Sequence, residues 1–137
     1  MVGLSREVLN LTDGLDDFVG EHCGALVSFF GVVRNRHNGK SVDCIDYECH
    51  ESMCLKMMHK IEDEVGRKWP DVSLVLIHRI GMVKLGEASI LVHCASPHRK
   101  DSYEASQYVM NRVKEILPIW KREFHPDGKT SWVGLGS

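Results

Sequence analysis

The sequence lacks a long apolar segment. A membrane-spanning helix needs roughly 18 consecutive apolar residues, and no run among the 137 residues approaches that length. The first six residues, Met1–Arg6, also lack the apolar stretch of a signal peptide. We therefore predict a cytoplasmic protein that has no membrane partner.

The sequence also has little net charge and no closely paired cysteines. A net charge of -2 gives no general electrostatic attraction to nucleic acid. The five cysteines include no CxxC pair, and Cys44, Cys49 and Cys54 recur every five residues, unlike the ligands of a zinc site. An odd number of cysteines favours free thiols in a reducing compartment. We predict no nucleic-acid partner, no metal and no cofactor.

Internal repeats, low-complexity segments and linkers are absent as well. A length of 137 residues suits one domain with a genuine core. The hydrophobic fraction of 43% and the charged fraction of 26% are ordinary for a globular protein. We expect residues 1–137 to form a single domain.

Hydrophobic periodicity predicts alternating strands and helices. Expected strands span residues 25–33, 42–49, 72–80 and 88–95, and expected helices span 15–20, 51–68 and 97–117. Gly81 and Gly86 bracket a short connection, and the tail 120–133 suggests short strands around a turn at Pro126. This order predicts an α/β or α+β fold with helices packed on a mainly antiparallel sheet.

Two lysines near the C-terminus, Lys114 and Lys121, lie seven residues apart among apolar neighbours. Pro118 ends the helix that carries the first of them. Partial burial of Lys121 beside Ile119 and Trp120 would penalise its ammonium form and lower its pKa. Such an amine can donate a proton or act as a nucleophile. The alternative is that both stems cover apolar surface while their charged ends stay in water.

The start of the helix expected at 97–117 has unusual charge. Ser96 suits the N-cap position and Pro97 suits the first helical position. Free backbone N–H groups and the helix dipole favour an anion at this end. Three basic residues nevertheless follow at once: His98, Arg99 and Lys100.

This basic cluster has two interpretations. A bound phosphate could compensate the charge, with Arg99 acting as a two-pronged donor and His98 as a second donor. Alternatively, Asp101 or Glu104 forms a salt bridge with the cluster. The local sequence favours neither interpretation.

Arg34 follows the apolar strand expected at 25–33 and opens a polar loop, residues 34–40. Residues at strand ends often bind ligands because a rigid scaffold holds them. The loop contains an Asn38–Gly39 turn signal. Its further basic residues are Arg36, His37 and Lys40. Read alone, the loop could equally be a solvated connection.

The two ends of the last helix are far apart. On a straight helix, the fifteen residues from Arg99 to Lys114 span about 22 Å, too far for one small metabolite to contact both. Either these residues belong to separate sites, or a second copy of the chain supplies one of them. A two-fold dimer would bring one copy's helix start beside the other copy's helix end.

Four segments together resemble one known family, the large, catalytic subunit of molybdopterin synthase. The resemblance covers residues 24–133, most of the chain. It rests on Gly31–Asn35, Ile77–Gly81, Pro97–Arg99 and Pro118–Glu123, in this order and at this spacing. The resemblance implies an α/β hammerhead-like domain with a small additional β subdomain.

The resemblance also implies an activity and partners. Enzymes of this family transfer sulfur from the thiocarboxylated C-terminus of a small ubiquitin-like carrier subunit to cyclic pyranopterin monophosphate. The product carries the dithiolene of molybdopterin. Two large subunits form a homodimer at the centre of a heterotetramer with two carriers. The implied class is therefore a sulfurtransferase of molybdenum cofactor biosynthesis.

The family's functional residues match positions of this sequence. Its essential lysines fall on Lys114 and Lys121, and its substrate-phosphate and pocket residues fall on Arg34, His98 and Arg99. We expect Lys121 to be the acid/base group, because proton transfers must accompany the loss of oxygen from the substrate. Lys114 would position the carrier's C-terminal carbonyl. The scattered cysteines agree with a sulfur donor outside this chain.

Two non-catalytic alternatives remain open at this point. The chain could be a module that binds a phosphometabolite through Arg34 and Arg99 without chemistry. It could instead only dock a ubiquitin-like tail. The first predicts ligand binding after loss of both lysines, and the second predicts carrier binding without affinity for any pterin.

Overall fold

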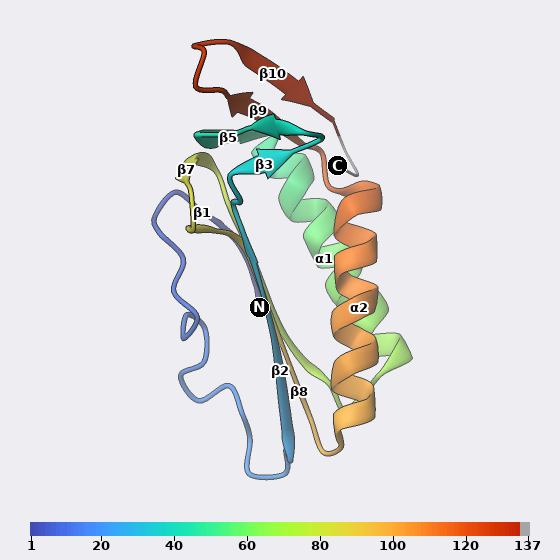
Figure 1. The fold of residues 1–137 in the computed structure, drawn as a ribbon. Coiled ribbons are helices and arrows are strands. Elements are labelled where there is room, and N and C mark those ends of the chain that lie inside the picture. The colour runs from blue at the N-terminus through green and yellow to red at the C-terminus, as the bar shows by residue number, and fades with distance from the viewer. Residues whose placement is uncertain (135–137) are drawn as a thin grey trace.

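The computed structural model describes residues 1–134, which form two larger sheets, a small hairpin and two helices (Figure 1). The helices are α1 (Glu51–Lys68) and α2 (Arg99–Ile116). The strands are β1 (Val2–Ser5), β2 (Ala25–Val32), β3 (Arg36–His37), β4 (Lys40–Ser41), β5 (Cys44–Cys49), β6 (Ser73–Arg79), β7 (Gly81–Lys84), β8 (Ala88–Ser96), β9 (Ile119–Phe124) and β10 (Thr130–Val133).

The first sheet has the strand order β1-β6-β8-β2. Strand β1 pairs parallel to β6, and the other neighbours pair antiparallel. Helices α1 and α2 cover one face, while the segment between β1 and β2 runs along the other (Figure 1). Leu9 of that segment packs against Ala88 and Leu91 of β8. Strand β8 is buried along its whole length, which explains its nearly continuous apolar sequence.

The second sheet, with the order β10-β9-β5-β7, lies beyond the C-terminal end of α2 (Figure 1). All of its pairings are antiparallel. Beside it lies the β3–β4 hairpin, whose two-residue turn has positive φ at both Asn38 (49°) and Gly39 (78°). Asn-Gly is the preferred sequence for this turn because both residues tolerate the left-handed conformation. The second sheet and this hairpin form the small β subdomain.

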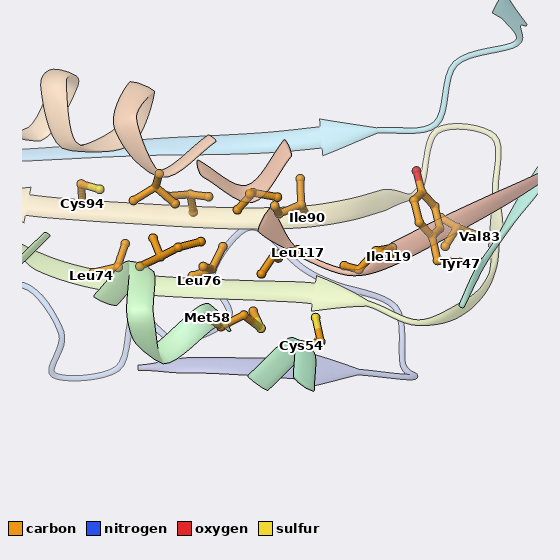
Figure 2. Packing of buried hydrophobic residues seen from close by; sticks show 14 of the residues in the cluster. Tyr47, Cys54, Met58, Leu74, Leu76, Val83, Ile90, Cys94, Leu117 and Ile119 are labelled. Carbon is orange, nitrogen blue, oxygen red and sulfur yellow. The ribbon is translucent and has the colours of Figure 1, made fainter. Parts of the chain in front are cut away.

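One apolar core continues from the first sheet into the second (Figure 2). Helix α1 contributes the buried stripe Cys54, Met58, Ile61 and Val65. Leu117 and Ile119, 1% and 7% exposed, carry the core across the junction between α2 and β9. Burying an aliphatic side chain of this size stabilises a fold by about 1.5–3 kcal/mol. The junction is therefore fixed on both sides of Pro118.

The sequence-based elements are largely confirmed. Helix α1 has the predicted bounds, and the predicted strands and the last helix are found within one to two residues. The tail forms β9 and β10 around the turn that contains Pro126. The α+β class with mainly antiparallel sheets is also confirmed.

Three details of the prediction are wrong. Residues 15–20 form turns rather than a helix, because Gly14 and Asp17 have φ values of 78° and 55°, which a right-handed helix cannot accommodate. The connection 81–86 contains strand β7, which pairs with β5. Strand β1 was not predicted, since an apolar segment this short gives little periodic signal.

The start of α2 also differs from the prediction. The N-cap is His98, and Ser96 is the last residue of β8. The Ser96 hydroxyl donates a hydrogen bond to the His98 carbonyl at 2.6 Å. Pro97 therefore precedes the helix, which begins at Arg99.

Candidate functional site

A pocket of about 210 Å³ lies where α2 ends against the second sheet. Within the described chain, its charged walls combine three cations, Arg34, Lys114 and Lys121, with the carboxylate of Glu123. Its remaining lining residues are Val32, Val33, His37, Ile45 and Tyr47. Three of the five predicted site residues thus meet in one pocket.

The buried junction after α2 explains why the two lysines meet. Lys114 lies in the last turn of α2, where the helix dipole favours a cation. Leu117 then anchors the chain in the core before β9 begins. Lys121 on β9 pairs with Tyr47 of β5. Since alternate strand residues share a face, Glu123 points to the same side as Lys121.

The pocket depresses the pKa of Lys121 below its ordinary value of 10.5. Partial burial is the largest cause, and the positive charges of Lys114 and Arg34 act in the same direction. The charge of Glu123 acts in the opposite direction. Lys121 is half-buried, as the sequence suggested, whereas Lys114 is exposed. The partial burial expected for Lys121 is therefore confirmed.

Glu123 is held by a residue of the β3–β4 hairpin. Its carboxylate lies 2.8 Å from Nδ1 of His37, and the two side chains are 6% and 20% exposed. A second contact joins the same hairpin to the chain after β9, since His125 donates from Nδ1 to the Ser41 carbonyl at 2.7 Å. The hairpin is thereby fixed as one wall of the pocket.

Behind the pocket lies a buried aromatic pair. The rings of Tyr47 and His78 meet edge to face, with centroids 5.2 Å apart. His78 donates from Nδ1 to the Arg79 carbonyl at 2.7 Å. Burial, together with the charges of Lys121 and Lys114, lowers the pKa of His78 to about 4. The imidazole is therefore neutral near pH 7 and adds no fourth positive charge.

Arg34 reaches the pocket from the end of β2. Its neighbour Val33 is 3% exposed. The Val33 backbone exchanges hydrogen bonds with the β7–β8 connection, donating to Glu87 and accepting from Gly86 at 3.0 and 2.8 Å. A buried residue thus fixes the backbone immediately before the guanidinium.

His98 and Arg99 do not join this pocket. Both are exposed at the first turn of α2, about 22 Å along the helix from Lys114. Glu104, one of the proposed salt-bridge partners, instead accepts a hydrogen bond from the Trp69 indole at 3.2 Å. Across residues 1–134, no ion pair joins Arg99 to Asp101 or Glu104.

The sequence assigned no role in the site to Tyr47, His78 or Glu123, and it named His37 only as one of the basic residues of the loop 34–40. A signal existed for Glu123, because a residue two positions after Lys121 on a strand shares its face. For His37 the basic composition of the loop was a signal, but its contact with Glu123 depends on where the hairpin packs.

Other classes of site find no support in the part of the chain that the structure describes. No group of three His, Cys, Asp or Glu residues in 1–134 is arranged to hold a metal ion. None of the helices described is long and apolar enough to cross a membrane.

Comparison with known proteins identifies the class to which this fold and pocket belong. The family described as MoaE protein matches residues 4–116. A molybdopterin synthase catalytic subunit of Bacillus subtilis is 42% identical over 131 residues, covering 96% of this chain and 83% of the relative. The crystal structure of molybdopterin synthase from Staphylococcus aureus superposes with a TM-score of 0.90 at 35% identity, covering 96% of this chain and 95% of that one.

A more distant structure shows the same fold. It belongs to a complex of subunits 1 and 2 of the molybdopterin-converting factor from Helicobacter pylori, with a TM-score of 0.80 at 21% identity. It covers 96% of this chain and 89% of that one.

The chain belongs to the MoaE protein family. Its role is that of an enzyme subunit in the biosynthesis of the molybdenum cofactor.

Proposed function

We propose that this chain catalyses sulfur transfer from the thiocarboxylated C-terminus of a small ubiquitin-like carrier to cyclic pyranopterin monophosphate. The observation that carries the proposal is the pocket in which Arg34, Lys114 and the half-buried Lys121 converge. Both reactants are anions, one a cyclic phosphate and the other a thiocarboxylate. A pocket with three cations and one carboxylate in the described chain attracts both electrostatically.

The pocket's size favours partial occupancy by each reactant. A volume of about 210 Å³ is below the roughly 300–1,000 Å³ of sites that enclose a drug-sized ligand. The pocket therefore accommodates the end of an extended carrier tail, or the reacting edge of the pterin, but not the whole substrate.

Lys121 is the proposed acid/base group. When the carrier's sulfur attacks the substrate, the departing oxygen needs a proton, and a lysine with a lowered pKa gives one up more readily than an ordinary lysine. Its depressed pKa and its position beside two other cations support this role. Lys114, exposed at the rim, is assigned to hold the carrier's terminal carbonyl.

The sulfur is proposed to come from the carrier and not from a cysteine of this chain. Burial raises the pKa of both Cys54 and Cys94 to about 12. A thiol needs its thiolate form to act as a nucleophile, so these two cysteines are poor donors.

His98 and Arg99 are the proposed ligands of the substrate phosphate, acting in a two-fold dimer. Because they lie about 22 Å from Lys114 along α2, a second copy provides the phosphate-binding end of the site in this arrangement. Two such chains with two carriers would form a heterotetramer. We expect residues 1–137 to act as one domain in the cytoplasm.

A reconstituted single-turnover assay tests the proposal. The purified chain is mixed with cyclic pyranopterin monophosphate and a thiocarboxylated carrier, and the dithiolene product is followed. We expect product from the wild type and a loss of about 100-fold or more in rate for Lys121→Ala, since general acid–base groups contribute roughly that much. Lys56→Ala, which removes an exposed lysine on α1, is the matched control and should retain the rate.

Two outcomes would change this assignment. No product from the wild type, with carrier binding confirmed, would reduce the function to docking or metabolite binding. Full turnover by Lys121→Ala together with no turnover by Lys114→Ala would exchange the roles of the two lysines.

A further inference from the structure

The β3–β4 hairpin places one more side chain on the charged network of the pocket. His37 lies immediately before the Asn38–Gly39 turn, and its Nδ1 is 2.8 Å from a carboxylate oxygen of Glu123. Both residues line the same pocket as Lys121. The carboxylate thus contacts the imidazole of His37 and lies on the same strand face as the ammonium group of Lys121.

We infer that His37 is a positioning residue, which acts on Lys121 by binding the Glu123 carboxylate and limiting how strongly that carboxylate pairs with the lysine. The inference adds a residue to the site of the proposed function, and its importance for catalysis rests on that function.

His37 and Lys121 both interact with one buried charge, the carboxylate of Glu123. Glu123 is 5% exposed, so its carboxylate depends on protein groups for much of its compensation. A donor from His37 occupies one oxygen in a fixed direction. Without that donor, the carboxylate would be compensated by the cations of the pocket, and Lys121 is the one on its own strand face. The ammonium form of Lys121 would then be more strongly stabilised.

The other charged and titratable groups around Lys121 either shift its pKa in a defined direction or stay neutral. Lys114 from α2 and Arg34 from the end of β2 lower its pKa. Tyr47 on β5 is buried, and its pKa is raised by that burial, so it stays neutral. His78 on β6 is also neutral, with a pKa of about 4. Glu123 is the neighbour that raises the pKa of Lys121. A residue that holds the Glu123 carboxylate in place therefore also affects the pKa of Lys121.

Competitive labelling of the full-length chain measures this effect without turnover. Trace acetic anhydride is applied across a pH series, and mass spectrometry reports the titration midpoint of Lys121, with Lys56 as an internal reference. We expect His37→Ala to raise the Lys121 midpoint by about half a pH unit or more. His37→Asn should match the wild type, because the asparagine amide nitrogen occupies the place of Nδ1.

A double-mutant comparison separates positioning from simple loss of structure. In a Glu123→Gln background, His37→Ala should cause no further change in the Lys121 midpoint, since the shared charge is already gone. Should His37→Ala fail to fold, His37→Gln replaces it, because its amide extends one bond too far to keep the same contact.

An unchanged midpoint in the folded His37→Ala or His37→Gln chain would overturn the inference. So would an equal shift in His37→Asn, or a shift that persists in the Glu123→Gln background. A lower melting temperature without a shift would mean that His37 only fastens the hairpin. Because no substrate is present, these results are independent of whether sulfur transfer is the correct function.

Discussion

At its last turn, α2 presents Lys114 to a pocket where two further cations and a buried carboxylate meet. At its first turn, the same helix presents His98 and Arg99 to solvent. Both ends carry positive charge, yet only the C-terminal cluster lies where the helix dipole favours it. The pocket end has the features of a site for proton transfer, and the proposed function assigns phosphate binding to the exposed end.

The difference suggests a division of labour between two copies of the chain. A group with a shifted pKa needs burial and fixed neighbours, which one chain supplies by folding. The binding of a phosphate needs positive charge and hydrogen-bond donors at the surface, where the substrate arrives. Substitutions at the two ends of α2 therefore test this division of labour.

The largest effect is expected from mixed dimers. Chains with Lys121→Ala and chains with Arg99→Ala are co-expressed with different affinity tags, and mixed dimers are isolated through both tags. If one site uses Arg99 from one copy and Lys121 from the other, half of the sites contain neither substitution. At a substrate concentration well below KM, two variants that are each impaired about tenfold or more should then give about half of the wild-type activity per dimer.

The reciprocal pairing is the control for that experiment. A chain with both substitutions is combined with a wild-type chain. Under the shared-site arrangement, each site then contains one substituted residue, and the activity at subsaturating substrate should fall to about a tenth of the wild-type value or less. Activity near half of the wild type in this pairing, with none in the first, would place both groups in one subunit and refute the shared site.

An intermediate effect is expected at the exposed end of α2. Arg99→Ala should raise KM for cyclic pyranopterin monophosphate roughly tenfold or more, because a charge-assisted hydrogen bond contributes about 1.5–3 kcal/mol. Arg99→Lys keeps the charge but loses the two-pronged geometry, so it should recover only part of the loss.

Lys100→Ala is the matched control for Arg99, because it removes the neighbouring exposed cation. It should change KM far less than Arg99→Ala does. Steady-state kinetics at fixed carrier concentration measure all three variants. Equal increases in KM for Arg99→Ala and Lys100→Ala would indicate that the positive charge at the helix start attracts the substrate in a general way, and that Arg99 is not a specific phosphate ligand.

Features that depend on local sequence could be predicted, and features that depend on how the elements pack could not. Helix α1 was predicted with its observed bounds, because its apolar spacing is local and strong. The pairing of Lys114 with Lys121 was also foreseeable, since only a proline-containing junction separates them. The exposed position of Lys114 was not, because its apolar neighbour Val113 is buried on a different face of α2.

The remaining parts of the site depend on tertiary packing. His37 contacts Glu123 only because a short hairpin folds back onto β9. Tyr47 reaches Lys121 through the register of β5 with β9, which local periodicity does not specify. Family resemblance supplied the role of Arg99, whereas the structure shows that this residue stands apart from the pocket of its own chain.

The smallest effect is expected when the rim of the pocket loses a charge. Lys114→Met removes a cation that lowers the pKa of Lys121 while keeping the length of the side chain. As a proton donor, Lys121 must be protonated, so the rate falls when the pH rises through its pKa, which lies below 10.5. With Lys114 replaced, that pKa rises and the alkaline limb of the rate profile moves to higher pH.

The expected shift is a few tenths of a pH unit, because Lys114 is exposed and its charge is screened. A pH series of single-turnover rates gives the position of the limb independently of its height, so weaker carrier binding by Lys114→Met does not obscure the result. Added salt should reduce the difference between wild type and variant, since screening already weakens the interaction in the wild type. A limb that stays in place at low salt, or moves to lower pH, would mean that the titrating donor is a group other than Lys121.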